Sequence, residues 1–310
     1  MIVSGDVMSS MCLIIQVFVK LDTLKGLLDS LLTCRGIGNL NVLIWQDGYI
    51  GSRKEDEYAQ KSREVRLFIE NESIKYSSSF ASLDFVSNDE NLGTCATCRA
   101  AVDYASSRFE KLIFTEDDSI FATDAIEWFD AALSLPEFQS PQVWAVSGES
   151  IFFDARGNAL PPGYSGLARD FVMEERLVNA FQKLKFVPST CFATTSEKWK
   201  EFSVTRGQPL GDVDVCKRCE KEDKYCIFPI VPRVKDIGML HPDGYSVLIH
   251  TAANVKSIKS TYLMSSDIPC PDGFGPFSLL PEHKNGDLWR RTVLLEGFGE
   301  LPPWDSASRT

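Results

Sequence analysis

The sequence has three histidines in 310 residues, and it has no hydrophobic run long enough to cross a bilayer. Its most apolar N-terminal stretch, Cys12 to Val19, is far shorter than the ~20 residues of a spanning helix. Lys20 and Asp22 follow it directly, and the region has neither the basic segment nor the cleavage site of a secretory signal. The sequence as written therefore predicts a cytoplasmic protein, or a trimmed one, without a membrane anchor.

Several catalytic motifs are also absent. We find no glycine-rich phosphate loop, no Ser/His/Asp nucleophile elbow and no HExxH helix. Lys and Arg number 32 against 43 Asp and Glu, giving a formal net charge of −11. Because affinity for a phosphate backbone depends on clustered Lys and Arg, this balance argues against a broad nucleic-acid-binding surface. A phosphate-bearing ligand would need a local cation or a metal ion.

Nine cysteines are scattered through the chain, and an odd number in a large protein fits reduced thiols better than a disulfide framework. Two CxxC pairs occur, Cys95 with Cys98 and Cys216 with Cys219, both in helix-like sequence. Zinc-binding pairs usually lie much closer together in sequence. We favour coincidence, and a structural zinc site stays the alternative.

The N-terminal third predicts a parallel β-α-β unit. The apolar run Leu13 to Val19 is rich in β-branched residues, as is typical of a strand buried on both faces. Leucines then recur at helical spacing between Leu21 and Leu32, and Asn41 to Trp45 forms a second buried strand. A strand, helix and strand in this order form a right-handed crossover.

The rest of the chain continues the alternation of helices and strands. Composition, with 44% hydrophobic and 24% charged residues, suits one large α/β domain or two packed halves. A long loop from Gly157 to Gly166 has the composition of a lid, and the chain after about Ser260 is irregular. We predict helices over residues 54–63, 94–107, 122–135, 173–185, 196–202 and 213–224, and strands over 65–69, 111–115, 143–147, 225–229 and within 186–194.

The acidic triplet Glu116-Asp117-Asp118 directly follows the predicted strand Lys111 to Thr115. Ligands of open α/β sheets bind at this carboxyl edge. Three neighbouring carboxylates repel one another in a low dielectric, and a divalent ion with oxygen ligands is the simplest partner that neutralises them. Capping of the following helix by the same acids is the alternative.

Four segments carry a resemblance to a known family. The run Leu112 to Phe129, which contains the triplet, resembles the metal-binding segment of the N-acetylglucosaminyltransferase I group of GT-A glycosyltransferases. Val42 to Gly48 is similar to the family's Gln-Asp segment near the nucleotide base, and Val143 to Ser147 to its Trp-x-Val-Ser strand. Cys226 to Pro229 resembles a late strand of the family. The similarity covers roughly residues 12–250.

This resemblance implies roles for the acids at the strand ends. Asp118 would contact the metal directly, while Glu116 and Asp117 would orient ribose, sugar or metal-bound water. Asp47 would lie near the uracil or the ribose.

The resemblance also implies a catalytic base. The family places this aspartate in a Trp-Asp-Asp-Trp segment, whose counterpart is Gly211-Asp-Val-Asp214. Asp212 is the first candidate and Asp214 the second, and an ordinary helix N-cap is the alternative for Asp212. The flanking tryptophans are absent, which leaves the acceptor contacts and the donor sugar open.

Further candidates lie in the second half of the chain. His250 is a candidate metal ligand, because some GT-A enzymes place a late histidine on the metal, and a surface histidine is the alternative. Arg233 and Lys235 could meet the diphosphate, or be solvated. We expect His241 and His283 in exposed loops. Four tryptophans are expected in the core, and two in the tail are freer to meet an acceptor: Trp45, Trp128, Trp144 and Trp199, then Trp289 and Trp304.

We therefore predict a GT-A-like three-layer α/β/α fold with a mostly parallel, Rossmann-like central sheet. Residues 1–118 would form the nucleotide-sugar-binding half, residues 119–255 the acceptor-binding and catalytic half, and residues 256–310 an irregular tail. The predicted activity is an inverting transfer from a nucleotide-sugar, preferably a UDP-sugar, that depends on Mn²⁺ or Mg²⁺.

The acceptor would be a glycan or a lipid-linked saccharide, and the latter would bring the enzyme to the inner membrane surface as a peripheral protein. Two rival classes remain open. A sugar-phosphate nucleotidyltransferase shares the layout but usually opens with a glycine-rich basic loop, which residues 5–23 lack. A non-catalytic carbohydrate-binding or scaffolding protein could retain the same fold.

Overall fold

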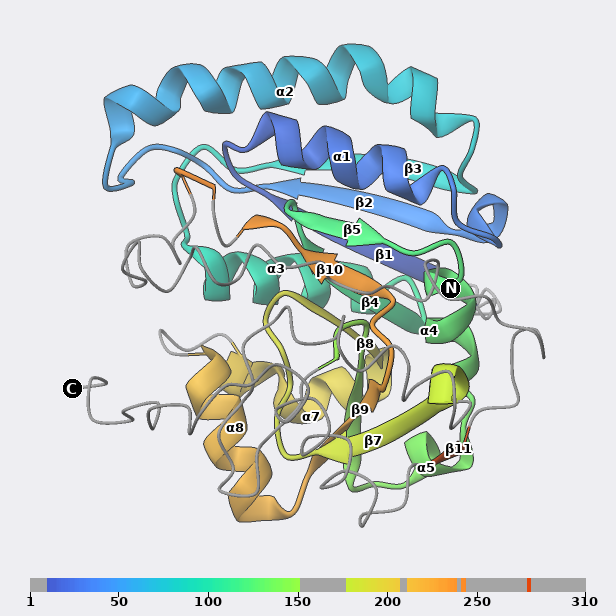
Figure 1. Ribbon diagram of the computed structural model, residues 1–310. Helices are drawn as coiled ribbons and strands as arrows, with labels where there is room; N and C mark the ends of the chain where they lie inside the picture. Colours follow the sequence, from blue (N-terminus) through green and yellow to red (C-terminus); the bar gives the residue numbers. More distant parts are fainter. Residues whose placement is uncertain (1–9, 151–176, 207–210, 239–240, 244–277, 280–310) are drawn as a thin grey trace, which may run out of the picture.

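A computed structural model of the chain describes residues 10–150, 177–206, 211–238, 241–243 and 278–279. In these residues nine strands form one sheet in the order β11-β7-β9-β6-β8-β4-β1-β2-β3, and β5 and β10 form a second sheet (Figure 1). The large sheet consists of β1 (Met11–Val17), β2 (Asn41–Gln46), β3 (Ser82–Ser87), β4 (Lys111–Glu116), β6 (Val143–Ser147), β7 (Ala180–Leu184), β8 (Cys191–Thr195), β9 (Tyr225–Pro229) and β11 (Ser278–Leu279).

The N-terminal half of the sheet is parallel throughout. β1 is buried along its whole length and lies between β2 and β4, with Ile14 opposite Leu43 on one side and Phe114 on the other. A strand with apolar residues on both faces needs cover on both sides of the sheet, which parallel crossovers supply. The predicted β-α-β unit is confirmed, since β1 pairs parallel with β2.

The other half of the sheet is mixed. β8 runs antiparallel to both β4 and β6, and β7 runs antiparallel to β9, while β6 and β9 are parallel. Two reversals of direction, from β4 to β8 and from β8 to β6, make β6 parallel to β4. The carboxyl ends of β1, β2, β4, β6 and β9 therefore meet at one edge of the sheet.

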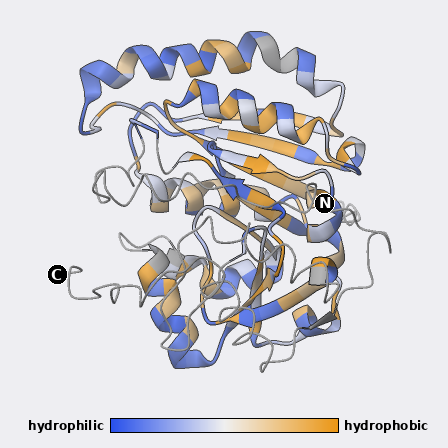
Figure 2. Ribbon diagram, viewed as in Figure 1, coloured by the Kyte–Doolittle hydropathy of each residue, from blue (hydrophilic) through white to orange (hydrophobic). Residues whose placement is uncertain are grey.

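Helices cover both faces and complete the predicted three-layer α/β/α architecture. One core lies under α1 (Leu21–Leu31), α2 (Glu55–Ser77), α4 (Ala125–Leu133) and α5 (Pro136–Gln139). The other lies under α3 (Thr94–Ser106), α7 (Ser196–Arg206) and α8 (Gly211–Glu222). Figure 2 shows hydrophobic residues concentrated along the central strands, while the outer helix α2 carries many hydrophilic residues. None of the described helices has the length and apolarity that a membrane crossing requires.

Three local predictions were wrong or incomplete. The segment 65–69 is not a strand but part of the long helix α2, because Val65, Phe68 and Ile69 bury one helical face. Residues 180–184, predicted as helix, form β7 after a short 3-10 helix at Leu177–Asn179. The edge strand β3 was not predicted, since its serines and Asp84 leave it half-buried and without a strong apolar signal.

The short second sheet joins two segments that are far apart in sequence. β5 (Ser119–Phe121) follows the acidic triplet and pairs antiparallel with β10 (Val234–Asp236), with Ser119 opposite Asp236. The main-chain N–H of Ala122 also donates to the carbonyl of Arg233, over 2.8 Å. This pairing brings the chain after β9 back to the end of β4.

Candidate functional site

The acidic triplet lies at the carboxyl end of β4, as predicted. Glu116 is the last residue of the strand and pairs with Gln16 of β1, and Asp117 and Asp118 form the turn into β5. Asp117 is 3% exposed and Asp118 is 6% exposed. Carboxylates buried to this extent need positive charge or hydrogen-bond donors nearby.

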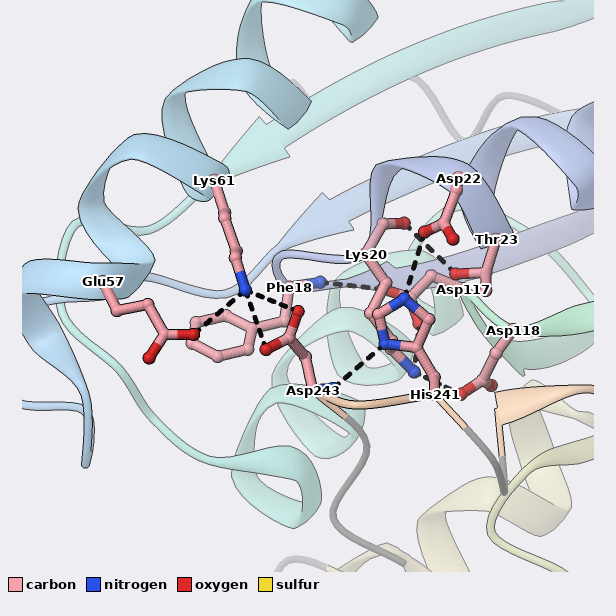
Figure 3. A network of polar contacts seen from close by, with 10 residues as sticks. All are labelled: Phe18, Lys20, Asp22, Thr23, Glu57, Lys61, Asp117, Asp118, His241 and Asp243. Atoms are coloured by element: carbon pink, nitrogen blue, oxygen red, sulfur yellow. Dashed lines mark hydrogen bonds and ion pairs between the residues drawn. The ribbon is translucent and has the colours of Figure 1, made fainter. Parts of the chain in front are cut away.

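Lys20 supplies positive charge to this turn. It follows β1 and is the N-cap residue of α1. Its Nζ lies 2.8 Å from Oδ1 of Asp117 and also contacts Oδ2 of Asp118 (Figure 3). The main-chain N–H of Phe18 donates to Oδ2 of Asp117 over 3.2 Å. Burial disfavours the ammonium ion, but the charges of Asp117 and Asp118 outweigh it and raise the pKa of Lys20.

The segment after β10 packs directly against Asp118. The N–H of Ile237 donates to the carbonyl of Asp118 over 2.8 Å, and the N–H of Gly238 donates to Oδ1 of Asp236 over 2.7 Å. A Cβ added at Gly238 would fall 1.7 Å from Oδ2 of Asp118. Glycine is therefore required here by close approach to the carboxylate.

Glu149 and Asp236 extend the acidic cluster beyond the triplet. Glu149 follows β6, and burial raises its pKa to about 8, with the charges of Asp236 and Asp118 adding to the effect and a hydrogen bond from the Thr190 hydroxyl opposing it. Burial likewise raises the pKa of Glu116, with the charge of Asp118 adding to it, and raises the pKa of Asp117 against the charge of Lys20. The cluster thus holds more carboxyl groups than Lys20 alone can neutralise, and their raised pKa values mean that protons offset part of the excess.

We tested whether these residues fit a divalent cation. Oδ1 of Asp118 is buried and has no hydrogen-bond partner within the described part of the chain. The donors are hard carboxylate oxygens, which Mg²⁺ and Mn²⁺ prefer. Among the described residues no group of three or more His, Cys, Asp and Glu side chains could hold a metal ion by itself. An ion on Asp118 would therefore need further oxygen ligands, such as the phosphate oxygens and water that Mg²⁺ usually binds.

Asp47 lies at the end of β2 on the same sheet edge, and its carboxylate accepts hydrogen bonds from neighbouring residues of the chain. Oδ1 accepts from the N–H groups of Gly48 and Leu92, at 3.0 Å and 2.9 Å. Oδ2 accepts from the side chain of Asn91 and the N–H of Gly93, each at 3.1 Å. A carboxylate has about four acceptor positions, so a nucleotide contact at Asp47 would have to replace one of these bonds.

Arg233 is fully buried between β9 and β10. Its guanidinium donates to the carbonyls of Val231 and Val178, at 2.6 Å and 2.7 Å. Its Nε lies 3.4 Å from a carboxylate oxygen of Asp124, at the start of α4. These contacts tie three segments of the chain together, and a contact with diphosphate stays a prediction.

The candidate bases lie on α8. Asp212 and Asp214 are in its first turn, where the side chain of Asp214 is half-buried and that of Asp212 lies outside the described residues. Val215 and Cys219 anchor α8 in the core that also contains Cys226 of β9. Because α8 ends just before β9 begins and packs on the sheet, it runs back from the side on which β9 ends.

The remaining predictions divide between the described and undescribed parts. His250, His283, Trp289 and Trp304 lie outside the described residues. His241 was predicted to be exposed, but its side chain is 14% exposed and its Nε2 lies 3.2 Å from Asp22. The tryptophans predicted for the core are buried, and the described cysteines, including both CxxC pairs on α3 and α8, are thiols outside any disulfide.

Comparisons with known proteins return structures but no sequence family. No family model and no curated protein matches the chain. A mannosyltransferase of Pyrobaculum calidifontis, solved with GDP-Man and Mn²⁺, is 16% identical with a TM-score of 0.37, over 72% of this chain and 57% of that one. Residues 1–349 of S. aureus TarS, solved with UDP, are 12% identical with a TM-score of 0.42, over 73% and 59%. This chain thus spans less than two thirds of the length of each of these two proteins.

Sequence reasoning missed three members of the cluster: Lys20, Glu149 and Asp236. A signal existed for two of them, because Lys20 follows β1 and Glu149 follows β6, and both strands end on the edge where the triplet lies. Asp236 had no such signal. It reaches the cluster through the pairing of β10 with β5, which no short-range pattern predicts.

Proposed function

We propose that this protein is an inverting glycosyltransferase that moves a sugar from a nucleotide-sugar, preferably a UDP-sugar, to a hydroxyl of a glycan or lipid-linked saccharide. The observation that carries the proposal is the buried Oδ1 of Asp118, which has no hydrogen-bond partner among the described residues and lies in an acidic cluster at the carboxyl edge of the sheet. Such an oxygen calls for a cation, and a diphosphate brings the remaining oxygen ligands. Nucleotide-sugars are substrates that contain this group.

In this proposal residues 1–118 bind the donor and residues 119–255 supply acceptor contacts and the base. Asp118 would hold Mn²⁺ or Mg²⁺, which supplies positive charge to the departing diphosphate. Glu116 and Asp117 would orient the ribose, the sugar or bound water, and Asp47 and Arg233 would contact the donor's base or ribose and its diphosphate. His250 is proposed as a further ligand of the ion.

The chain's other task is to move one proton. We assign the base to Asp212, with Asp214 as the second candidate, because both acids lie in the first turn of α8, which runs back from the side of the sheet on which β9 ends. A carboxylate there would take the proton of the acceptor hydroxyl while that oxygen forms its bond to the anomeric carbon. The bond to the diphosphate breaks on the opposite face, so the anomeric configuration inverts.

The test is an assay of nucleoside diphosphate release. The protein is incubated with UDP- and GDP-sugars, with Mn²⁺, with Mg²⁺ and with a chelator, in the presence of simple saccharide acceptors. We expect release from one donor, only with metal, and a loss of at least ~10²-fold in Asp212→Asn. If Asp214→Asn alone loses activity, the base is Asp214.

Two outcomes would contradict the proposal. Nucleotide binding without release, unchanged in Asp212→Asn, would indicate a non-catalytic carbohydrate-binding or scaffolding role. Formation of a nucleotide-sugar and pyrophosphate from a nucleoside triphosphate and a sugar phosphate would indicate a nucleotidyltransferase.

A further inference from the structure

Lys20 is the cation that the structure places inside the acidic cluster. Its side chain is 12% exposed, and its Nζ bridges Oδ1 of Asp117 and Oδ2 of Asp118. Figure 3 shows the side chain reaching from the start of α1 toward both carboxylates. The contact joins residues 98 positions apart in sequence, so it depends on the pairing of β1 with β4 and not on local structure.

The ammonium group of Lys20 contacts the same carboxylate, that of Asp118, that we propose as the metal ligand. On Asp118, Lys20 occupies Oδ2, while Oδ1 is buried and has no partner in the described part of the chain. A divalent ion bound at Oδ1 would therefore lie on the same carboxylate as Nζ. Two cations on the two oxygens of one buried carboxylate repel each other, and salt screens this repulsion only weakly.

We propose that Lys20 is an internal counterion that competes with a divalent cation for Asp118 and that moves to the diphosphate of the nucleotide when the donor binds. This inference rests on the proposed function and adds that the metal ion and the nucleotide depend on each other for binding. Without a diphosphate, Lys20 neutralises the aspartates and opposes the ion. When a diphosphate is bound, its oxygens contact both the Lys20 ammonium group and the divalent ion. The ion and the nucleotide therefore bind more tightly together than either does alone.

The proposal predicts positive coupling between two ligands. Each ligand raises the affinity of the other by the same factor, because the coupling free energy is reciprocal. For the wild-type chain we expect Mn²⁺ to bind at least tenfold more tightly in the presence of saturating UDP or GDP, whichever binds better, than alone.

The experiment measures Mn²⁺ binding by electron paramagnetic resonance on the full chain, with and without the nucleotide. Lys20→Met removes the charge and keeps the length of the side chain. We expect it to bind Mn²⁺ alone at least tenfold more tightly than wild type, to gain less from the nucleotide and to bind the nucleotide more weakly. Lys20→Arg keeps the charge and should bind Mn²⁺ alone as weakly as wild type.

Lys25→Met is the matched control, since it removes an exposed lysine from the same helix and should behave as wild type. The inference is overturned if folded Lys20→Met binds Mn²⁺ no more tightly than wild type, while the wild type still shows nucleotide-dependent Mn²⁺ binding. If Lys20→Met does not fold, equal affinity of the wild type for Mn²⁺ with and without nucleotide overturns it. Absence of both Mn²⁺ and nucleotide binding overturns the proposed function as well.

Discussion

Gly238 and Asp118 touch across the junction of β5 and β10, and this contact leaves no room for a side chain. Alanine at 238 would place Cβ 1.7 Å from Oδ2 of Asp118, so the carboxylate or the backbone must move. We expect Gly238→Ala to weaken Mn²⁺-dependent nucleotide binding at least tenfold and to cost about 1–3 kcal/mol of unfolding free energy. Calorimetric titration and urea unfolding measure the two effects.

Gly38→Ala is the control for this change, because nothing lies within 4 Å of an added Cβ there. It should leave both quantities close to wild type. Unchanged nucleotide binding in Gly238→Ala would show that the position of the Asp118 carboxylate does not matter for the ligand.

Glu149 makes stability depend on pH. Its pKa is about 8 in the folded protein against an ordinary value of 4.5, so the folded state binds the extra proton between these values. The stability linked to this proton is fully present below about pH 4.5 and is lost as pH rises through about 8. In a chelator, wild type should lose stability relative to Glu149→Gln between pH 5 and pH 9.

Urea unfolding at pH 5, 7 and 9 checks this expectation. Glu70→Gln, which removes an exposed carboxylate of α2, should follow wild type at all three values. A constant difference between wild type and Glu149→Gln across the range would contradict the raised pKa of Glu149.

At the scale of elements, the sequence predicts strands better than it predicts their partners. The apolar runs that form β1, β2 and β4 are short, β-branched and bounded by polar residues, so the strands and the position of the triplet at a strand end could be predicted. The run Val65 to Ile69 shows the limit. A short apolar run fits a strand and a buried helical turn equally well, and the packing of α2 on the sheet decides between them.

The candidate site shows the same division. The acids of the triplet are adjacent in sequence and could be found by inspection, but of their partners Lys20 follows β1 and Asp236 lies in β10. Their arrival depends on strand pairing over long sequence separations, which a single sequence does not specify. The hydrogen bonds between the Asp47 carboxylate and the residues before α3 could not be predicted from the sequence either, because the donors are the backbone N–H groups of Leu92 and Gly93.

A buried hydrogen bond joins helix α4 to β6. Nε1 of Trp128 donates to the carbonyl of Ser147 over 2.9 Å, whereas the N–H of the equally buried Trp144 has no hydrogen-bond partner within the described residues. Both changes to phenylalanine remove the same volume, but only Trp128→Phe removes a hydrogen bond. We expect Trp128→Phe to be about 1 kcal/mol more destabilising than Trp144→Phe, measured by urea unfolding. Equal losses would contradict this assignment.

At the scale of the whole molecule, one edge of the sheet brings together charged residues from distant parts of the chain. The ends of β1, β4 and β6 bring Lys20, the triplet and Glu149 together, and β10 closes the cluster with Asp236 and Gly238. The segment beyond β10 is also fixed to the N-terminal helices, since His241 contacts Asp22 and Asp243 pairs with Lys61 at 2.7 Å (Figure 3). We therefore propose that this edge is one binding surface for a cation and a diphosphate.

The most direct test of this account is a calorimetric titration of UDP and GDP, with and without Mn²⁺, on wild type, Asp118→Ala and Asp130→Ala. Asp130 is the control, because its side chain lies on α4 and is 61% exposed. We predict that one nucleotide binds only with Mn²⁺, that Asp118→Ala loses this binding and that Asp130→Ala keeps it. Absence of binding by either nucleotide at millimolar concentration, or undiminished binding in Asp118→Ala, would contradict it.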